Sequence, residues 1–515
     1  MLLRSGRSGG AIDLRARTNM RRRLFRSGGM AVVQICWTTL VMFIVYRTVT
    51  HQFGFSILGV WATAIAFASL VSLFDIGISD IMVRQIAGAL GRADPAHARG
   101  LHMVLTAGSV IGLLMGSIAI APFMISYLQA SAPLALRSAV PTIVGGALFV
   151  GSFNVLSVGQ GGVLEALGRY DLKLGISFVS GLAVLGITYW CMQSETASDI
   201  SYIFTTGSVI TVLLTFVVAH YHLLRLSPHV RRLSMSELCS IIRIAAPTRV
   251  ASILTLGLDP VTRGLMIRYA DVESSAVYEI AYRVIFQLRS ALVAGLQTIV
   301  PYLSRLNASY DEDRNNIVLS AGVFAVSIAT PLMVLAVMGM PIISEVILGK
   351  NPASIGIYAS LLAIAWLVNI ASAPGYFANL AIGQVHRNWI SQAVACTCNV
   401  LLAPSFAVLW HGIGVCAAYA AAILAGAIAT LLGRATESRM LLRLIMLDFG
   451  VFAAGVLSVV LTGLLWRLLP VGPKLITWNI VFMGIYCAVA ASSVVRAIRF
   501  RGTAYLESAI INRGA

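Results

Sequence analysis

Long apolar runs dominate the chain and recur from residue 30 to residue 498. A bilayer core of about 30 Å needs roughly 20 apolar residues per helix, and fourteen runs approach or exceed that length. Hydrophobic residues fill 58% of the 515 positions and charged residues 11%, whereas a soluble domain spends about a quarter of its residues on charge. The sequence lacks the alternating pattern of a membrane β-barrel. We therefore predict an all-α polytopic membrane protein with about fourteen transmembrane helices.

The boundaries of these helices follow from the polar breaks between the runs. The break at His411-Gly412 is short, so a single bent hairpin is an alternative to two spans there. The predicted spans are 30–50, 54–76, 101–128, 138–162, 174–193, 200–224, 239–262, 276–301, 315–340, 355–382, 388–410, 412–433, 446–468 and 475–497.

Arginine and lysine near the span ends predict the orientation, because cytoplasmic loops carry an excess of both. With the N-terminus inside, most of the 37 Lys and Arg residues fall on the cytoplasmic side, beginning with the arginines of residues 4–26. We expect both termini in the cytoplasm. The net charge of +17 lies in short loops, which favours membrane lipids over nucleic acid as its partner. Few basic residues fall on the predicted outer side: Arg137, Arg263, Arg268, Lys350, Arg467 and Lys474.

Two stretches of the chain resemble each other weakly, residues 59–90 and residues 276–308. Trp61 then aligns with Tyr278, and Ala64 with Ala281. Internal repeats of this kind are typical of transporters whose site lies between two halves. We predict two pseudo-symmetric six-helix halves plus a C-terminal helix pair. The predicted segments are a basic cytoplasmic segment 1–29, halves 30–225 and 226–433, the pair 434–498 and a cytoplasmic tail 499–515.

The segment "YRTVTHQFGFSILGVWATAIAFASLVSLFDIGISDIMVRQIA" (46–87) resembles the opening of the polysaccharide flippases. These are the Wzx-type branch of the multidrug/oligosaccharidyl-lipid/polysaccharide exporter superfamily. Two features depart from the family: His51-Gln52 replaces the commoner Leu-Gly, and fourteen spans stand where many members have twelve. The matching positions are Arg47, Gly54, Gly59, Asp75 and Gly77, with later similar blocks at 165–172, 276–284, 300–308 and 379–423.

Residues 277–301 form a predicted span that carries an unusual number of charges. A charge at the bilayer centre costs about 2.5 to 3.5 kcal/mol on insertion scales. At about 100° per residue, Glu279, Arg283 and Gln287 share one side of this helix, with Arg289 at the edge. This row of polar side chains must face protein or water, not lipid. Either Arg283 simply pairs with Glu279, or Arg283 and Arg289 line a central aqueous cavity.

Two further arginines, Arg47 and Arg249, fall within predicted spans. Pro247 and the segment 257–260 should bend the span around Arg249, which a cavity or neighbouring helices would tolerate. Full pairing with Asp75, Glu165, Asp259 and Glu279 is the alternative, yet two of these acids sit at the cytoplasmic ends. We therefore expect some unpaired positive charge in the cavity.

Unpaired guanidinium groups suit a phosphate ligand, since arginine offers planar bidentate donors. The resemblance implies the pyrophosphate of a polyprenyl-linked oligosaccharide as substrate, the bacterial inner membrane as location and other polysaccharide assembly proteins as partners. It thus implies export of repeat units for O-antigen, capsule or exopolysaccharide. The predicted substrate-binding residues are Arg47, Arg249, Arg283, Arg289 and Gln287, and the predicted coupling carboxylates are Asp259 and Glu279.

Other functions leave weaker marks in the sequence. A cation-coupled multidrug exporter of the same superfamily would need an acidic cavity for cationic drugs, whereas arginine is the commoner buried charge here. A polysaccharide polymerase would need a long outer loop, and the predicted arrangement has none. No Walker-type phosphate loop occurs, so we expect the chain to bind no ATP, and no Cys/His ligand set supports a metal site. We expect a transporter without a cofactor and not an enzyme. The seven cysteines fall in or beside apolar runs and are interpreted as small apolar side chains.

Overall fold

The structure is a computed structural model that describes residues 30, 33–75, 78–191, 199–241, 243, 253–254, 258–297, 311–349, 352, 354–381, 384–432 and 484. These residues are helical apart from short turns, and nine of their helices are long and apolar enough to cross a membrane. The all-α polytopic prediction is confirmed. Segment 1–29, the tail, and all of the predicted C-terminal pair except residue 484 lie outside the described residues.

The first helical group comprises residues 33–226. It opens with a helix Val33–Phe53, and Gly54 then turns the chain with φ 82°, a left-handed conformation that glycine adopts without strain. The helices that follow are α2 (Phe55–Ala68) with the 3₁₀ turn η1 (Ser69–Asp75), α3 (Ile78–Gly91), α4 (Pro95–Ser131), η2 (Leu134–Leu136), α5 (Val140–Ala166), α6 (Tyr170–Cys191) and α7 (Asp199–Leu226).

The second helical group comprises residues 258–432. Its last helix is interrupted at Trp410 and His411, where His411 has φ 48°, so two helices meet at a kink. The predicted break between spans 388–410 and 412–433 is therefore confirmed. Its helices are α9 (Asp259–Tyr269), α10 (Val272–Gln297), α12 (Asp311–Leu348), α13 (Ser354–Ala381) and α14 (Val385–Leu432).

One boundary differs from the prediction in a way that matters for the site. The last residues of the predicted span 239–262 belong to α9, which runs to Tyr269, and only a tight turn at Ala270–Asp271 separates α9 from α10. Arg263, which we expected in an outer loop, therefore lies inside a helix with 5% of its surface exposed. Pro260 occupies the first turn of α9, where a proline is compatible with helix initiation.

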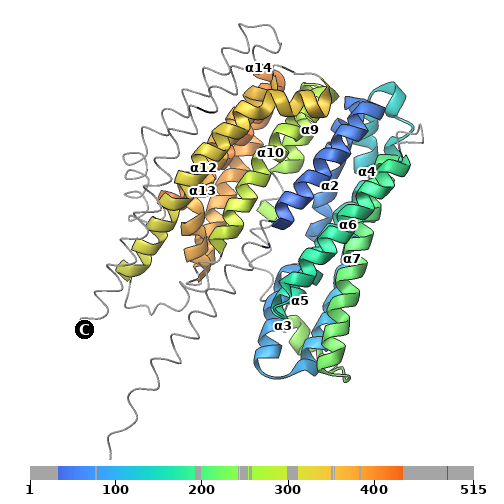
Figure 1. The fold of residues 1–515 in the computed structure, drawn as a ribbon, viewed down its shortest axis with the longest axis vertical. Coiled ribbons are helices and arrows are strands. Elements are labelled where there is room, and N and C mark those ends of the chain that lie inside the picture. The colour runs from blue at the N-terminus through green and yellow to red at the C-terminus, as the bar shows by residue number, and fades with distance from the viewer. Residues whose placement is uncertain are drawn as a thin grey trace, which may run out of the picture.

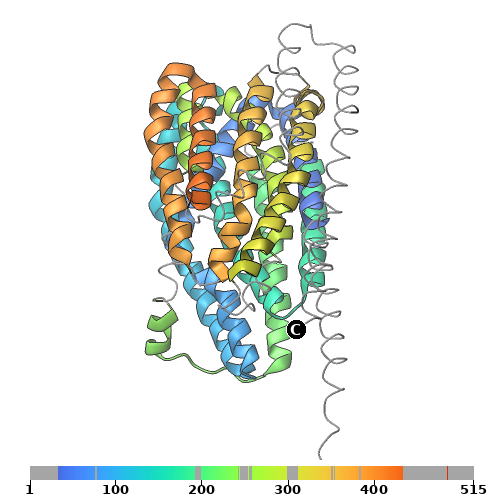
Figure 2. The same ribbon diagram turned by 90° about the vertical axis from the view of Figure 1, so that its left-hand side faces the viewer.

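The two groups lie side by side, with α2 of the first packed against α9 and α10 of the second (Figure 1). Figure 2, turned so that the second group faces the viewer, shows that long helices of both groups run along the same axis. The contact is close at Gly59, where a Cβ atom would stand 2.1 Å from the Val272 carbonyl oxygen. This seam between the groups, at the end where α9 turns into α10, positions the site.

Candidate functional site

A buried carboxylate, Glu279, lies at the seam with 1% of its surface exposed. Its Oε2 accepts hydrogen bonds from Arg263 Nε at 3.1 Å and Nη2 at 2.6 Å. Its Oε1 accepts from Arg283 Nε at 2.7 Å and from the Tyr46 hydroxyl at 3.2 Å. Because Tyr46 belongs to the first group, the carboxylate joins both groups at one point.

A second carboxylate, Asp259, completes the cluster. Its Oδ2 lies 3.5 Å from Arg263 Nη1 and accepts a hydrogen bond from the Tyr282 hydroxyl at 3.2 Å. The guanidinium of Arg263 also stacks 4.8 Å from the centre of the Tyr282 ring. Two arginines, Arg263 and Arg283, thus face two acids and the formal charge balances. Such balance is what makes buried ions tolerable, because an uncompensated buried charge is strongly destabilising.

The start of α9 is held by an asparagine from α14. Asn399 donates from Nδ2 to the Leu258 carbonyl oxygen at 3.2 Å and is bonded to the Thr262 hydroxyl at 3.1 Å. The Leu258 carbonyl oxygen also accepts from the Thr262 backbone N–H at 3.1 Å, so Asn399 adds a second hydrogen bond to the first turn of α9. These contacts fix the turn of α9 that carries Arg263.

Arg289 occupies a different environment, further along α10 than the Glu279 cluster. Its Nε and Nη2 donate to Asn369 Oδ1 at 3.3 and 3.2 Å, and its guanidinium lies 5.0 Å from the Trp366 ring centre and 5.9 Å from that of Phe286. Within the described residues, no carboxylate lies within 4.0 Å of it. The Asn369 amide oxygen and the two aromatic ring faces stabilise the positive charge of Arg289.

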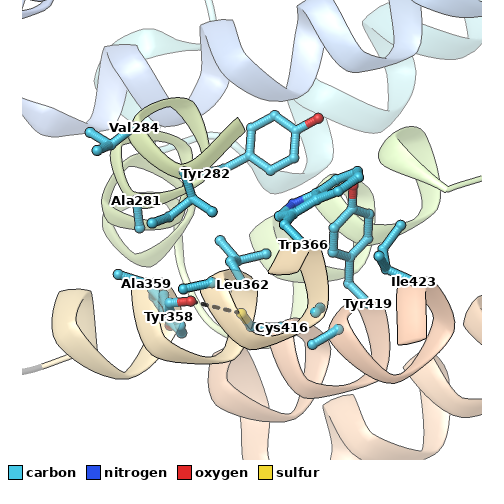
Figure 3. Close-up of a cluster of buried hydrophobic side chains, with 14 of the residues drawn as sticks. Ala281, Tyr282, Val284, Tyr358, Ala359, Leu362, Trp366, Cys416, Tyr419 and Ile423 are labelled. Carbon is cyan, nitrogen blue, oxygen red and sulfur yellow. Dashed lines mark hydrogen bonds between the residues drawn. The ribbon is translucent and has the colours of Figure 1, made fainter. Parts of the chain in front are cut away.

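Aromatic side chains connect the two environments through the core of the second group. Figure 3 shows Tyr282 of α10, Trp366 of α13 and Tyr419 of α14 in one cluster. The Tyr419 ring lies 6.1 Å from Tyr282 and 6.4 Å from Trp366, centre to centre. Close packing of these rings gives the Glu279 cluster and the Arg289 site a common rigid wall.

The predicted site residues are thus only partly brought together. Glu279, Arg283 and Asp259 form one cluster, in which Arg283 pairs with Glu279, the first of the two alternatives that the sequence left open. Arg289 forms its own site, and Gln287 is half-buried on α10 between them. Arg249 lies outside the described residues.

Arg47 is a further correction, because the structure exposes it instead of burying it in the cluster. Successive helical residues point about 100° apart, and the neighbouring Tyr46 is the residue that faces inward, with 2% exposed. No pattern in the sequence singled out Tyr46 or Asn369. Arg263 did carry a signal: Asp259 and Arg263 are spaced i,i+4 with the acid first, the favourable order for a helical ion pair.

No family model matches this chain, and no curated protein matches it in sequence. Solved structures do match in shape. A multidrug resistance MATE family transporter of the MOP superfamily, in an inward-facing conformation, aligns with TM-score 0.63 at 15% identity over 78% of this chain and 95% of its own. The Lipid II flippase MurJ in an inward closed conformation aligns with TM-score 0.60 at 13% identity over 87% and 98%.

A third similar structure is the Vibrio cholerae MATE transporter VcmN in the bent form, with TM-score 0.54 at 12% identity over 83% of this chain and 98% of its own. At such identities the likeness concerns the fold. The chain therefore has the polytopic helical fold found in MATE transporters and in the Lipid II flippase MurJ.

Proposed function

We propose that this protein is a flippase that moves polyprenyl-pyrophosphate-linked oligosaccharide repeat units across the bacterial inner membrane, for O-antigen, capsule or exopolysaccharide synthesis. The observation that carries the proposal is the guanidinium of Arg289, which the described residues leave without a carboxylate partner. Its Nη1 makes no hydrogen bond to a described residue, so donors remain for a phosphate oxygen. A pyrophosphate offers the anionic oxygens that arginine binds bidentately.

The aromatic wall beside Arg289 supports the same ligand class. Trp366 and Phe286 present ring faces to the guanidinium, which keeps water away from the charge and strengthens its attraction for an anion. In this proposal the headgroup enters a central chamber from the cytoplasmic leaflet while the polyprenyl tail stays in lipid. Gln287 and Arg249 are proposed to assist along the headgroup path.

Movement of the two helical groups would expose the headgroup to the other side. The Tyr46–Glu279 hydrogen bond joins the two groups at the seam, and in this proposal breaking it opens that end of the molecule. We assign the coupling role to Glu279 and Asp259. Their negative charges are balanced by two arginines, so a change in the charge of the cluster would alter the contact between the two groups. Both termini are proposed to be cytoplasmic, and the transport step needs no covalent chemistry.

A second candidate function is a cation-coupled multidrug exporter. The shape likeness to MATE structures favours it, and so do the two carboxylates gathered beside the seam. The two candidates differ in the charge of their ligand. A flippase of the proposed kind binds a lipid pyrophosphate at Arg289, whereas a drug exporter binds an organic cation at the acids.

Ligand binding to the purified full chain in nanodiscs separates these functions. The probes are undecaprenyl pyrophosphate, undecaprenol and the cation tetraphenylphosphonium, titrated against wild type, Arg289→Gln and the exposed control Arg268→Gln. We expect wild type to bind the pyrophosphate in preference to the alcohol, and Arg289→Gln to bind it about tenfold or more weakly, because a hydrogen bond to a charged group contributes about 1.5–3 kcal/mol. Equal pyrophosphate affinity in wild type and Arg289→Gln, or preference for the cation, would overturn the proposal.

A further inference from the structure

A fully buried imidazole, His102 of α4, lies inside the first helical group, away from the seam. Its Nε2 is 2.6 Å from Gln160 Oε1 of α5, and Gln160 Nε2 donates to the Thr106 hydroxyl at 2.8 Å. A carbonyl oxygen only accepts hydrogen bonds, so His102 carries its proton on Nε2. Nδ1 of the neutral ring then presents a lone pair.

That Nδ1 is buried and has no hydrogen-bond partner among the described residues. The same is true of Nδ1 of His220, whose ring centre on α7 lies 6.0 Å from that of His102. Phe216 stacks on both rings, at 5.4 and 5.7 Å, and holds them in place. A buried polar atom without a partner calls for a ligand or an unseen proton carrier, and here two such atoms belong to neighbouring rings.

The groups around the pair come from every helix packed there. His220 is the titratable group from α7, Arg99 is the charged group one turn before His102 on α4, and α5 offers the neutral amide of Gln160. Met82, Ile86 and Ile176 are apolar side chains that α3 and α6 contribute here, and Lys173 of α6 lies against Gly161 of α5 and pairs with Glu165. The two imidazoles are thus packed against apolar side chains of α3 and α6, with Arg99 as the nearby charge on α4.

We propose that His102 and His220 together form a binding site for a single proton. The proton binds the Nδ1 lone pair of one ring, and the Nδ1 of the other ring stabilises it across a bridging water or after a small ring rotation. No other bond breaks. A second proton is excluded, because two positive rings at this separation repel each other beside the positive Arg99.

Arg99 links the histidine pair to residues 227–238, the segment that follows α7 in the chain. Arg99 Nη1 donates to the carbonyl oxygens of Ser227 and Pro228 at 3.4 and 2.5 Å, directly after α7 ends. A bound proton places a second positive charge next to Arg99. The protonation state of the pair therefore acts on the contact between α4 and the start of the 227–238 segment.

Histidine ring C2–H exchange, followed by mass spectrometry on the purified full chain, measures the titration of each imidazole separately. We expect the pair to take up one proton as the pH falls, with the two rings sharing one main midpoint. In His220→Asn, the exchange midpoint of His102 should move to lower pH by about one unit or more, because the proton loses its second nitrogen. The control His222→Asn, two residues away on α7, should leave it unchanged.

Three results would overturn the proposal. They are no titration of either ring over the pH range in which the chain stays folded, two independent titrations of one proton each, and an unshifted His102 profile in His220→Asn. The wild-type titration needs no variant, so the proposal stays testable even if His220→Asn folds poorly. Amide exchange of residues 227–238 is the second measurement, and it should speed up in wild type as the pair takes up its proton.

Discussion

The hydroxyl of Tyr46 donates a hydrogen bond to Glu279 at 3.2 Å, although the two residues are 233 positions apart in the chain. The bond joins the two helical groups at the carboxylate that also binds Arg263 and Arg283. The ion cluster and the contact between the groups therefore share one residue. Further hydrogen bonds between the groups join Thr50 to Ile347 at 2.9 Å, Thr63 to Ser275 at 3.4 Å and Tyr127 to Gly264 at 2.7 Å.

Charge balance in the cluster predicts the outcome of a double substitution. Glu279→Gln leaves two arginines facing Asp259 alone and should cost about 3–5 kcal/mol of unfolding free energy, as breaking a buried pair does. Adding Arg283→Gln restores the balance and should recover at least about 1 kcal/mol. Unfolding by sodium dodecyl sulfate in mixed micelles measures both. Additive losses in the double variant would show that charge balance does not hold the cluster together.

The close approach of α2 and α10 predicts that Gly59→Ala forces the groups apart. The new Cβ would meet the Val272 carbonyl oxygen at 2.1 Å and its Cγ1 at 2.9 Å, and backbone cannot yield as a side chain can. Overpacking of this kind costs about 1–3 kcal/mol. The matched control is Gly145→Ala on α5, where a Cβ meets no atom within 4 Å. The thermal unfolding temperature should fall in the first variant only; equal behaviour of the two would contradict the seam described here.

A disulfide across the seam should lock this end of the molecule. The Thr63 and Ser275 hydroxyl oxygens lie 3.4 Å apart, so a Thr63→Cys, Ser275→Cys pair in a cysteine-free background can form a bond. We expect spontaneous cross-linking, detected by a gel shift after proteolysis between the groups, and loss of transport that a reductant reverses. Transport at the wild-type rate by the fully cross-linked protein would show that the seam does not open during the cycle.

The start of α4 should respond to acid. Asp94 accepts a hydrogen bond from the His97 backbone N–H at 3.0 Å and pairs with Arg231, and the backbone bond first, then the arginine, holds the pKa of Asp94 below its usual value. A depressed pKa stabilises the helix start above the unfolded-state value of about 4, and this contribution is lost as the pH falls through the folded-state pKa.

Hydrogen exchange of the amides of residues 96–98, corrected for intrinsic rates, checks this behaviour. Protection should decline below about pH 4 in wild type. In Asp94→Ala, protection should be low and independent of pH over the same range. If Asp94→Ala kept the wild-type dependence of amide protection on pH, the response would belong to another titratable group.

Much of the fold could be predicted from the sequence because the bilayer imposes a length on each apolar run. The break at His411 was visible because a polar residue and a glycine interrupt one such run. The end of α9 was predicted wrongly, because Arg263 and Arg268 resemble loop residues when their partners are not known. Arg263 is buried only because Glu279 and Asp259 meet it, and that depends on how α9 packs against α10.

The candidate site was predictable where its residues share one helix. The i,i+4 spacing placed Glu279 beside Arg283, and the position of Arg289 on the same helix was evident. Partners from other helices were not, since Tyr46 and Asn369 are ordinary residues whose role arises only from packing. The exposure of Arg47 likewise depends on how the helix Val33–Phe53 is rotated, which its hydropathy does not determine.

Lipid movement in proteoliposomes tests whether this protein carries a pyrophosphate-linked lipid across the bilayer by way of Arg289. The full chain is reconstituted with a fluorescent undecaprenyl pyrophosphate, and dithionite quenching reports the lipid that has crossed the bilayer. We predict that wild type and Arg268→Gln move the pyrophosphate lipid and not the matching fluorescent undecaprenol, and that Arg289→Gln moves it about tenfold or more slowly. Movement by Arg289→Gln at the wild-type rate, or equal movement of the alcohol by wild type, would show that Arg289 does not select a lipid pyrophosphate.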